Sequence, residues 1–182
     1  MKLYDIISNL KFIGIKNYKD IEIDSLSCRC QEKCSNSLFF CVNGTKVDGH
    51  NYAEQAIENG AVCLVVERFL DIKIIQILVD DVRKAMSYIS SVFFKTYASK
   101  MKFVGITGTN GKTTTTFILR EILMSLGHSV GLIGTEGTYI NNLMLPPTLT
   151  TPDPIDLHKL IADMDNNGCE YCVMEVSAHA IA

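Results

Sequence analysis

Residues 105–114 have the composition of a phosphate-binding loop. They read Gly-Ile-Thr-Gly-Thr-Asn-Gly-Lys-Thr-Thr and lie between a short apolar run and a segment with helical spacing. Glycines let several backbone N–H groups of one turn point at an anion, and a following helix adds the positive end of its dipole. Lys112 supplies a mobile cation and Thr113 a hydroxyl suited to Mg²⁺. This arrangement predicts a site for a nucleoside triphosphate with Mg²⁺ as cofactor.

The spacing departs from the strict phosphate-loop pattern in one place. That pattern has a glycine five residues before Gly111, whereas this chain has Ile106 there, with Gly105 and Gly108 on either side. An ordinary strand–turn–helix with a glycine-rich corner is the alternative. The lysine and threonine in the expected positions favour the nucleotide loop.

A carboxylate is predicted at the same edge of the sheet as this loop. Glu175 closes an apparent strand at 170–176, and ligands of doubly wound sheets bind at the carboxyl ends of the strands. An acid there can hold Mg²⁺ that bridges the β- and γ-phosphates. A solvated strand end is the alternative for Glu175.

Strands alternate with helices along the chain, which predicts an α/β fold. Helical spacing is found at 3–10, 52–59, 82–97, 115–126 and 155–166. Apolar runs predict strands at 21–23, 38–42, 61–66, 74–79, 103–107, 130–134 and 170–176, with loops at 25–37 and 145–154. The first unit ends near Ala98. Because the second sheet has only three strands before the chain stops, we expect a fragment of a longer protein.

Composition excludes some classes of function. There are 17 Lys and Arg against 20 Asp and Glu, a net charge of −3, and no basic cluster, which argues against nucleic acid as a partner. The start of the chain carries an acid where a signal peptide needs an apolar stretch, and the longest apolar run, 61–66, is too short to cross a bilayer. We therefore expect a cytosolic protein with reduced thiols, monomeric and not bound to a membrane.

Seven cysteines raise the question of a metal site. Cys169 and Cys172 have the spacing of a chelating pair, but side chains three apart on a strand face opposite sides. A zinc site at Cys28, Cys30 and Cys34 is the other alternative, although such sites usually show two well-spaced ligand pairs. We interpret all seven as structural or incidental.

Residues 108–114 resemble the ATP loop of the Mur ligase family, whose members add amino acids to the bacterial cell-wall precursor. Residues 174–180 resemble the family's MEVSSHAL segment, with Ala178 in place of the second serine. The resemblance implies that Lys112 and Glu175 are catalytic and that Thr113 and Glu175 serve the metal. The implied ATP-binding residues are Gly108, Thr109, Asn110, Gly111, Lys112, Thr113 and Thr114.

Three further segments resemble the family branch that adds the third residue. Residues 24–26 resemble its DSR motif, with Leu26 replacing the arginine, residues 38–50 resemble LFVALxGxxxDGH, and residues 150–154 read TTPDP. Taken alone, Lys46 is equally a solvated lysine, and the TTPDP loop is more often a helix-capping turn with Asp153 before the helix. The resemblance implies that the UDP-substrate is bound by Ile23, Ser25, Thr45, Lys46, Val47, Thr150, Thr151 and Ser177.

The resemblance also implies an architecture and a reaction. A small N-terminal α/β domain that binds uridine, residues 1–98, would precede the first part of a parallel-sheet ATPase domain, residues 99–182. The partners would be ATP, UDP-MurNAc-dipeptide and a diamino acid, joined as an amide through an acyl phosphate. The alternatives are another Mur-type or a folylpolyglutamate-type ligase, and a non-catalytic fragment that binds nucleotide. We expect no ligation by these residues alone.

Overall fold

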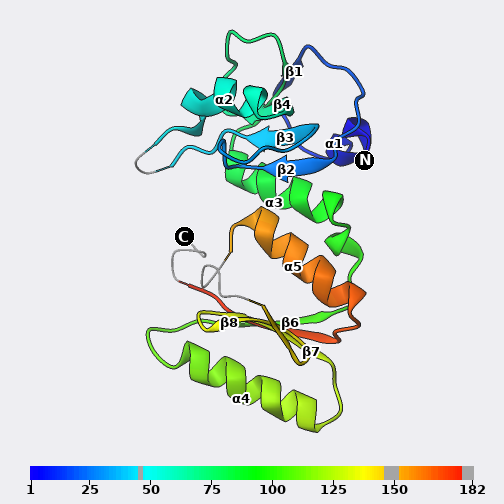
Figure 1. Cartoon of the computed structure of the whole chain (residues 1–182), viewed down its shortest axis with the longest axis vertical. Helices are drawn as coiled ribbons and strands as arrows, with labels where there is room; N and C mark the ends of the chain where they lie inside the picture. Colours follow the sequence, from blue (N-terminus) through cyan, green and yellow to red (C-terminus); the bar gives the residue numbers. More distant parts are fainter. Residues whose placement is uncertain (45–46, 146–151, 178–182) are drawn as a thin grey trace. The chain divides into compact units, whose positions relative to one another are not determined.

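The computed structural model describes residues 1–44, 47–145 and 152–177 (Figure 1). The chain divides into two units, Met1–Phe93 and Phe94–Ala182, where the sequence placed the boundary near Ala98. Each unit is built on its own five-stranded sheet. The chain is thus an α/β protein with two sheets, as expected.

The sheet of the first unit has the strand order β1-β5-β4-β3-β2. Strands β2 to β5 run parallel, and β1 runs antiparallel to β5 at one edge. The inner strands β3 and β4 are buried almost throughout, because both faces of a parallel sheet are covered. The strands are β1 (Gly14–Lys16), β2 (Ser25–Ser27), β3 (Ser37–Phe40), β4 (Ala61–Val66) and β5 (Ile75–Leu78).

Successive residues of these strands point to opposite faces of the sheet, and helices pack against the side chains. Phe39 and Cys41 pack with Ala53 and Ala56 in a cluster under α2. The neighbouring Phe40 is fully buried and points to the opposite face, since successive strand residues alternate. The helices are α1 (Leu3–Ile7), the 3-10 turn η1 (Gly49–Tyr52), α2 (Ala53–Glu58) and α3 (Val82–Phe93).

Two predictions for the edges of this sheet were wrong. Residues 21–23 form no strand but only an isolated bridge from Glu22 to Lys2, and the predicted loop at 25–37 contains the strand β2. Strand β1 was not predicted. These strands have only three residues each, so no hydrophobic period develops, and pairing with a neighbour decides them.

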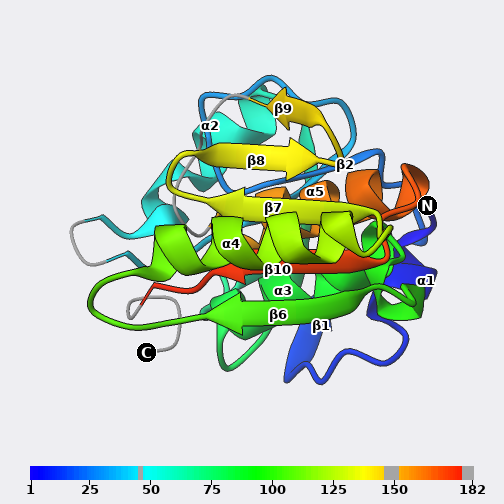
Figure 2. The same cartoon turned by 90° about the horizontal axis from the view of Figure 1, so that it is seen from below.

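The sheet of the second unit has the order β6-β10-β7-β8-β9. The three strands that the sequence predicted, β6, β10 and β7, run parallel. Helix α4 covers one face and α5 the other, and Figure 2 shows the strands side by side with β6 at one edge. The elements are η2 (Thr96–Ala98), β6 (Lys102–Ile106), α4 (Lys112–Ser125), β7 (Val130–Gly134), β8 (Gly137–Ile140), β9 (Leu143–Leu145), α5 (Pro154–Asn166) and β10 (Tyr171–Glu175).

The hairpin β8–β9 makes this sheet mixed rather than parallel. Both strands pair antiparallel, and the turn between them contains Asn141 with a φ of 52°. Arg120 of α4 is buried, donates to the Asn141 carbonyl oxygen at 2.5 Å and lies 5.1 Å from the Tyr139 ring centroid. The hairpin therefore depends on a helix distant in sequence, which periodicity cannot reveal.

Candidate nucleotide-binding site

The glycine-rich loop joins the end of β6 to the start of α4. Gly108 and Gly111 have φ angles of 151° and 78°, which favour glycine because they lie in the left-handed region. Residues 107–111 are exposed, so a ligand can reach the loop. The loop thus has the open, curled backbone of an anion-binding turn.

Helix α4 begins at Lys112, three residues earlier than the predicted Thr115. Gly111 is its N-cap residue, and the Thr115 N–H and hydroxyl both donate to the Gly111 carbonyl, at 2.9 and 2.7 Å. The first turn therefore contains Lys112, Thr113 and Thr114, whose N–H groups have no partner within the helix itself. A 14-residue helix with this start is well suited to binding phosphate.

The Lys112 side chain folds back over the loop. Its Nζ donates to the Gly108 carbonyl oxygen at 2.7 Å. This contact holds the ammonium group against the backbone of the loop. Because its partner is a neutral carbonyl, an anionic phosphate oxygen would be the stronger acceptor.

Glu175 is the last residue of β10 and pairs in register with Ile106, the last residue of β6. The Val176 N–H donates to the Ile106 carbonyl at 2.9 Å and continues the pairing to the point where the loop starts. The carboxylate therefore belongs to the same edge of the sheet as the loop. Its side chain is not solvated, since Glu175 is only 1% exposed.

Thr135, directly after β7, bonds both oxygens of the Glu175 carboxylate. Its N–H donates to Oε1 and its hydroxyl to Oε2, each at 3.0 Å. Gly134 makes this approach possible, because a Cβ at that position would lie 2.5 Å from Oε1. Sequence analysis missed Thr135, although it follows a predicted strand at the edge where the loop was expected.

The predicted UDP-substrate residues of the described chain lie in the first unit, apart from Ser177 just beyond β10. Ser25 begins β2 and its hydroxyl donates to the Ser35 carbonyl at 3.2 Å, and Val47 is 50% exposed. Ile23 is fully buried, with its N–H and carbonyl both bonded to Met1, so it has a core role whatever else it does. Thr45, Lys46, Thr150 and Thr151 lie outside the described residues. All these substrate contacts stay predictions.

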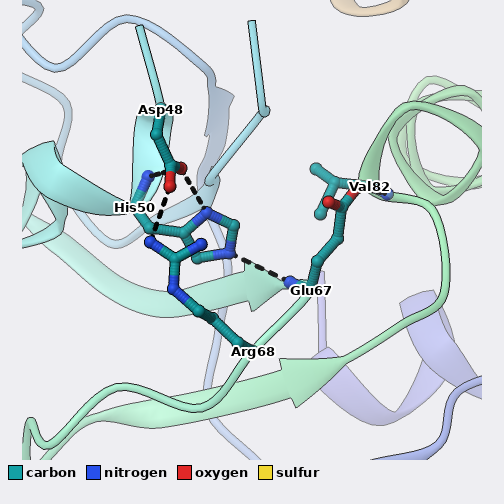
Figure 3. Close-up of polar contacts among 5 residues, drawn as sticks. All are labelled: Asp48, His50, Glu67, Arg68 and Val82. Carbon is teal, nitrogen blue, oxygen red and sulfur yellow. Dashed lines mark hydrogen bonds and ion pairs between the residues drawn. The ribbon is translucent and has the colours of Figure 1, made fainter.

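A hydrogen-bond network around the buried His50 includes Asp48, Glu67 and Arg68 (Figure 3). Asp48 Oδ1 accepts from the His50 N–H at 2.9 Å and contacts His50 Nδ1 at 2.6 Å, while Oδ2 accepts from Arg68 Nη2 at 2.6 Å. The His50 N–H and the Arg68 guanidinium hold the pKa of the Asp48 carboxyl well below its usual range. Asp48 is therefore charged at neutral pH.

The tautomer of His50 follows from its second partner. Nε2 lies 3.0 Å from the backbone nitrogen of Glu67, whose N–H can only donate. Nε2 must then be the acceptor, so the proton is on Nδ1 and points at Asp48. The Glu67 side chain extends the network, since its Oε1 accepts from the Val82 N–H at the start of α3 (3.0 Å). The network thus connects Asp48 and His50 to the residues after β4 and to the start of α3.

Both units match one family of proteins. Residues 106–182 match the Mur ligase middle domain, and residues 18–96 match the Mur ligase family, catalytic domain. This chain belongs to the Mur ligase family.

Relatives of this Mur ligase chain are similar over its whole length. The UDP-N-acetylmuramoyl-L-alanyl-D-glutamate–2,6-diaminopimelate ligase of Geobacillus thermodenitrificans is 39% identical over 181 residues, which are 100% of this chain and 37% of the relative. Ligase 1 of that name from Clostridium acetobutylicum is 40% identical over 184 residues, 100% of this chain and 38% of the relative. The chain thus spans 37–38% of the length of these relatives.

A solved structure shares the fold. A UDP-N-acetylmuramoyl-L-alanyl-D-glutamate–2,6-diaminopimelate ligase superposes with a TM-score of 0.72 and 24% identity, over 88% of this chain and 35% of that one. The agreement concerns the arrangement of strands and helices in space.

In this Mur ligase chain Asp153 has the contacts of a helix cap, which was the alternative interpretation of this residue. Asp153 is the N-cap of α5, with Oδ1 accepting from the Asp156 N–H at 3.0 Å, and Pro154 follows at the first helical position. Leu26, which replaces the arginine of the DSR motif, is buried in β2 with 8% exposure. A charged side chain would be costly there, so Leu26 acts as a core residue.

All seven cysteines lie in the described part of the Mur ligase chain, and none forms a disulfide. Residues 1–44, 47–145 and 152–177 contain no group of three or more His, Cys, Asp or Glu arranged to hold a metal ion, and none of their helices is long and apolar enough to cross a membrane. Cys28 and Cys34 are half-buried, whereas Cys41, Cys63 and Cys172 are fully buried.

Burial should protect the last three thiols from alkylation. Burial raises the pKa of Cys41 and of Cys172 to about 12 and also raises that of Cys63, so at pH 8 their reactive thiolates are scarce. Iodoacetamide should label Cys28 and Cys34 at least about 100-fold faster than Cys172 in the native chain. Mass spectrometry of the peptides measures this ratio, with urea-unfolded chain as the control in which all sites react. Equal native rates would contradict the buried positions.

Proposed function

We propose that this chain is the UDP-substrate- and nucleotide-binding portion of an ATP-dependent ligase. The complete protein would join 2,6-diaminopimelate to UDP-N-acetylmuramoyl-L-alanyl-D-glutamate, the reaction named for the relatives. The observation that carries the proposal is the loop between β6 and α4, together with Glu175 of β10, which pairs in register with Ile106 at the start of that loop. Residues 1–93 would bind the uridine end of the UDP-substrate.

The residues of the site fit the chemistry of an acyl-phosphate ligase. A substrate carboxylate attacks the γ-phosphorus of ATP and releases ADP, and the amine then displaces phosphate to form the amide. The loop N–H groups and Lys112 would hold the phosphates and offset the charge that builds on the transferred group. These groups would act by positioning the phosphates and by electrostatic stabilisation, so no side-chain nucleophile is needed.

The donor set at this edge also fits Mg²⁺. Thr113 offers a hydroxyl and Glu175 a carboxylate, and Mg²⁺ prefers oxygen ligands. The cation would offset charge on the β- and γ-phosphates when bound. We propose Thr113 and Glu175 as its protein partners, directly or through water.

We further propose that the ligase works as a monomer in the cytoplasm, where cysteine thiols stay reduced. Size-exclusion chromatography with light scattering tests the oligomeric state, and a dimer would contradict this part.

Calorimetry on the 182-residue chain tests the function without requiring turnover. ATP with MgCl₂ should bind, ATP in EDTA should bind more weakly, and UDP-N-acetylmuramoyl-L-alanyl-D-glutamate should bind independently of ATP. A folate substrate should give no heat. Flat titrations with ATP and MgCl₂ would contradict the nucleotide site, and folate binding in place of the UDP-substrate would favour the related folate-type ligase.

A further inference from the structure

We infer that the ion pair between Asp48 and Arg68 positions Val47 to bind the UDP-substrate, an inference that rests on the proposed function. Val47 is the predicted substrate residue directly before Asp48, and it is 50% exposed. Arg68 follows β4, the strand beside β3 in the sheet, and its Nη2 donates to Asp48 Oδ2 at 2.6 Å. Arg68 is thus a positioning residue that acts through Asp48.

The first argument is that the backbone on either side of Asp48 is closed onto the residues after β3. The Gly44 N–H donates to the Val47 carbonyl oxygen, and the Gly49 N–H donates to the Val42 carbonyl oxygen, each at 2.9 Å. A Cβ at Gly49 would lie 2.6 Å from that Val42 oxygen, so the close approach requires a glycine. These contacts shape the segment itself, and its place against the next strand depends on other contacts.

The second argument is that Asp48 and His50 supply the contacts to the residues after β4. His50 Nε2 accepts from the Glu67 N–H at 3.0 Å, and Asp48 Oδ2 accepts from Arg68. Figure 3 shows the Asp48 carboxylate between its two partners, with His50 on Oδ1 and Arg68 on Oδ2. With a partner on each oxygen the carboxylate keeps one orientation, and the adjacent Val47 is held with it.

The third argument is the place of the pair in the sheet. Strands β3 and β4 are parallel neighbours that end at Phe40 and Val66, and Asp48 and Arg68 follow these ends. Ligands of open α/β sheets bind outside the carboxyl ends of the strands. The ion pair therefore fixes the chain at the edge where such a sheet binds its ligand.

The fourth argument is that the pair is accessible to solvent. The Arg68 side chain is 52% exposed and the Asp48 side chain 24%. Pairs that are this exposed contribute little to folding. Without Arg68 the fold should persist, but Val47 would occupy its binding position for a smaller fraction of the time. Apparent affinity falls in proportion to that fraction, so the pair matters more for binding than for stability.

Substitution of Arg68 tests the inference by calorimetry on the 182-residue chain. R68Q should weaken binding of UDP-N-acetylmuramoyl-L-alanyl-D-glutamate roughly tenfold. The melting temperature should change by less than about 3 °C and the ATP affinity by less than about twofold. R68M should repeat the loss with an apolar side chain of similar length.

Two further variants serve as controls for charge. R68K keeps a donor for one oxygen of Asp48, which an ammonium group can also bond, and should bind the UDP-substrate within about threefold of wild type. R83Q removes the same charge from an exposed position of α3 and should bind it like wild type. A tenfold loss in R83Q would overturn the inference, because net charge alone would then explain the effect of R68Q.

A double-mutant cycle tests whether Arg68 acts through Asp48. D48N keeps the shape of the side chain and an acceptor for the His50 N–H but removes the charge that Arg68 bonds. In the D48N background, R68Q should weaken binding of the UDP-substrate by less than about twofold, because the pair is already broken. A tenfold loss from R68Q in both backgrounds would mean that Arg68 contacts the substrate itself, and would overturn the positioning role.

The outcomes separate this inference from the proposed function. If wild type binds the UDP-substrate and R68Q and R68M match it, the positioning role is overturned while the function stands. If both variants lose ATP binding and thermal stability as well, Arg68 has a structural role and the inference is also overturned. If wild type binds ATP but not the UDP-substrate, the function proposed for residues 1–93 is overturned and the inference with it.

Discussion

Replacing Lys112 with alanine should weaken ATP binding to this chain at least about 100-fold, equivalent to about 2.7 kcal/mol. The Lys112 ammonium donates to the Gly108 carbonyl, so it is held against the loop that we propose binds the phosphates. Its removal takes away the one charged donor that the loop residues 105–114 contribute. Calorimetric titration with ATP and MgCl₂ measures the loss.

A lysine elsewhere on the same sheet provides the control. Lys102 begins β6 at the opposite end of the strand, and its Nζ lies 3.3 Å from the Tyr171 hydroxyl. K102A changes the net charge by the same amount as K112A and should leave the ATP affinity within about twofold. Equal losses in both variants would mean that Lys112 acts only through net charge, and no loss in K112A would contradict the nucleotide site.

Replacing His50 with alanine should destabilise the first unit by about 3 kcal/mol. The His50 side chain is fully buried and bonds both Asp48 and the Glu67 N–H. Alanine would leave a cavity and an unsatisfied donor at Glu67, and Asp48 would lose the ring contact. Hydrogen exchange read by mass spectrometry should show faster exchange of β4 peptides, with β7 peptides unchanged.

His128 offers the matched substitution in an exposed ion pair. Its Nδ1 lies 2.9 Å from Glu170 Oε2, with side chains 34% and 54% exposed. Because exposed pairs contribute little, H128A should cost under about 1 kcal/mol. Slow hydrogen exchange of β4 in H50A would contradict the structural role of the Asp48–His50 network. A large loss of stability in H128A would show that the difference in burial does not explain the different effects of the two substitutions.

Sequence analysis predicted the parts of this protein that depend on local pattern. The buried strands at 61–66 and 130–134 agree with β4 and β7, because continuous apolar runs record burial on both faces. The loop at 105–114 and its helix follow from glycines and a lysine at short spacing. The family was identified for the same reason, since its motifs are short contiguous segments.

The edges of both sheets could not be predicted in this way. Strand β2 was interpreted as loop, and the hairpin β8–β9 was missed. Three- and four-residue strands carry no period, and a polar strand is stabilised by its neighbour's backbone rather than by its own side chains. Arg120, from another element, packs against this hairpin.

The sequence alone determined which residue types suit the chemistry and that they lie at the ends of strands. Lys112 and Thr113 follow one strand, and Glu175 ends another. The tertiary structure alone decided their partners. Thr135 meets Glu175 because the strand order places β10 beside β7, and His50 meets Glu67 because the chain returns after β4. Hydrogen bonds between residues far apart in the chain depend on strand order and register, and neither is encoded in local spacing.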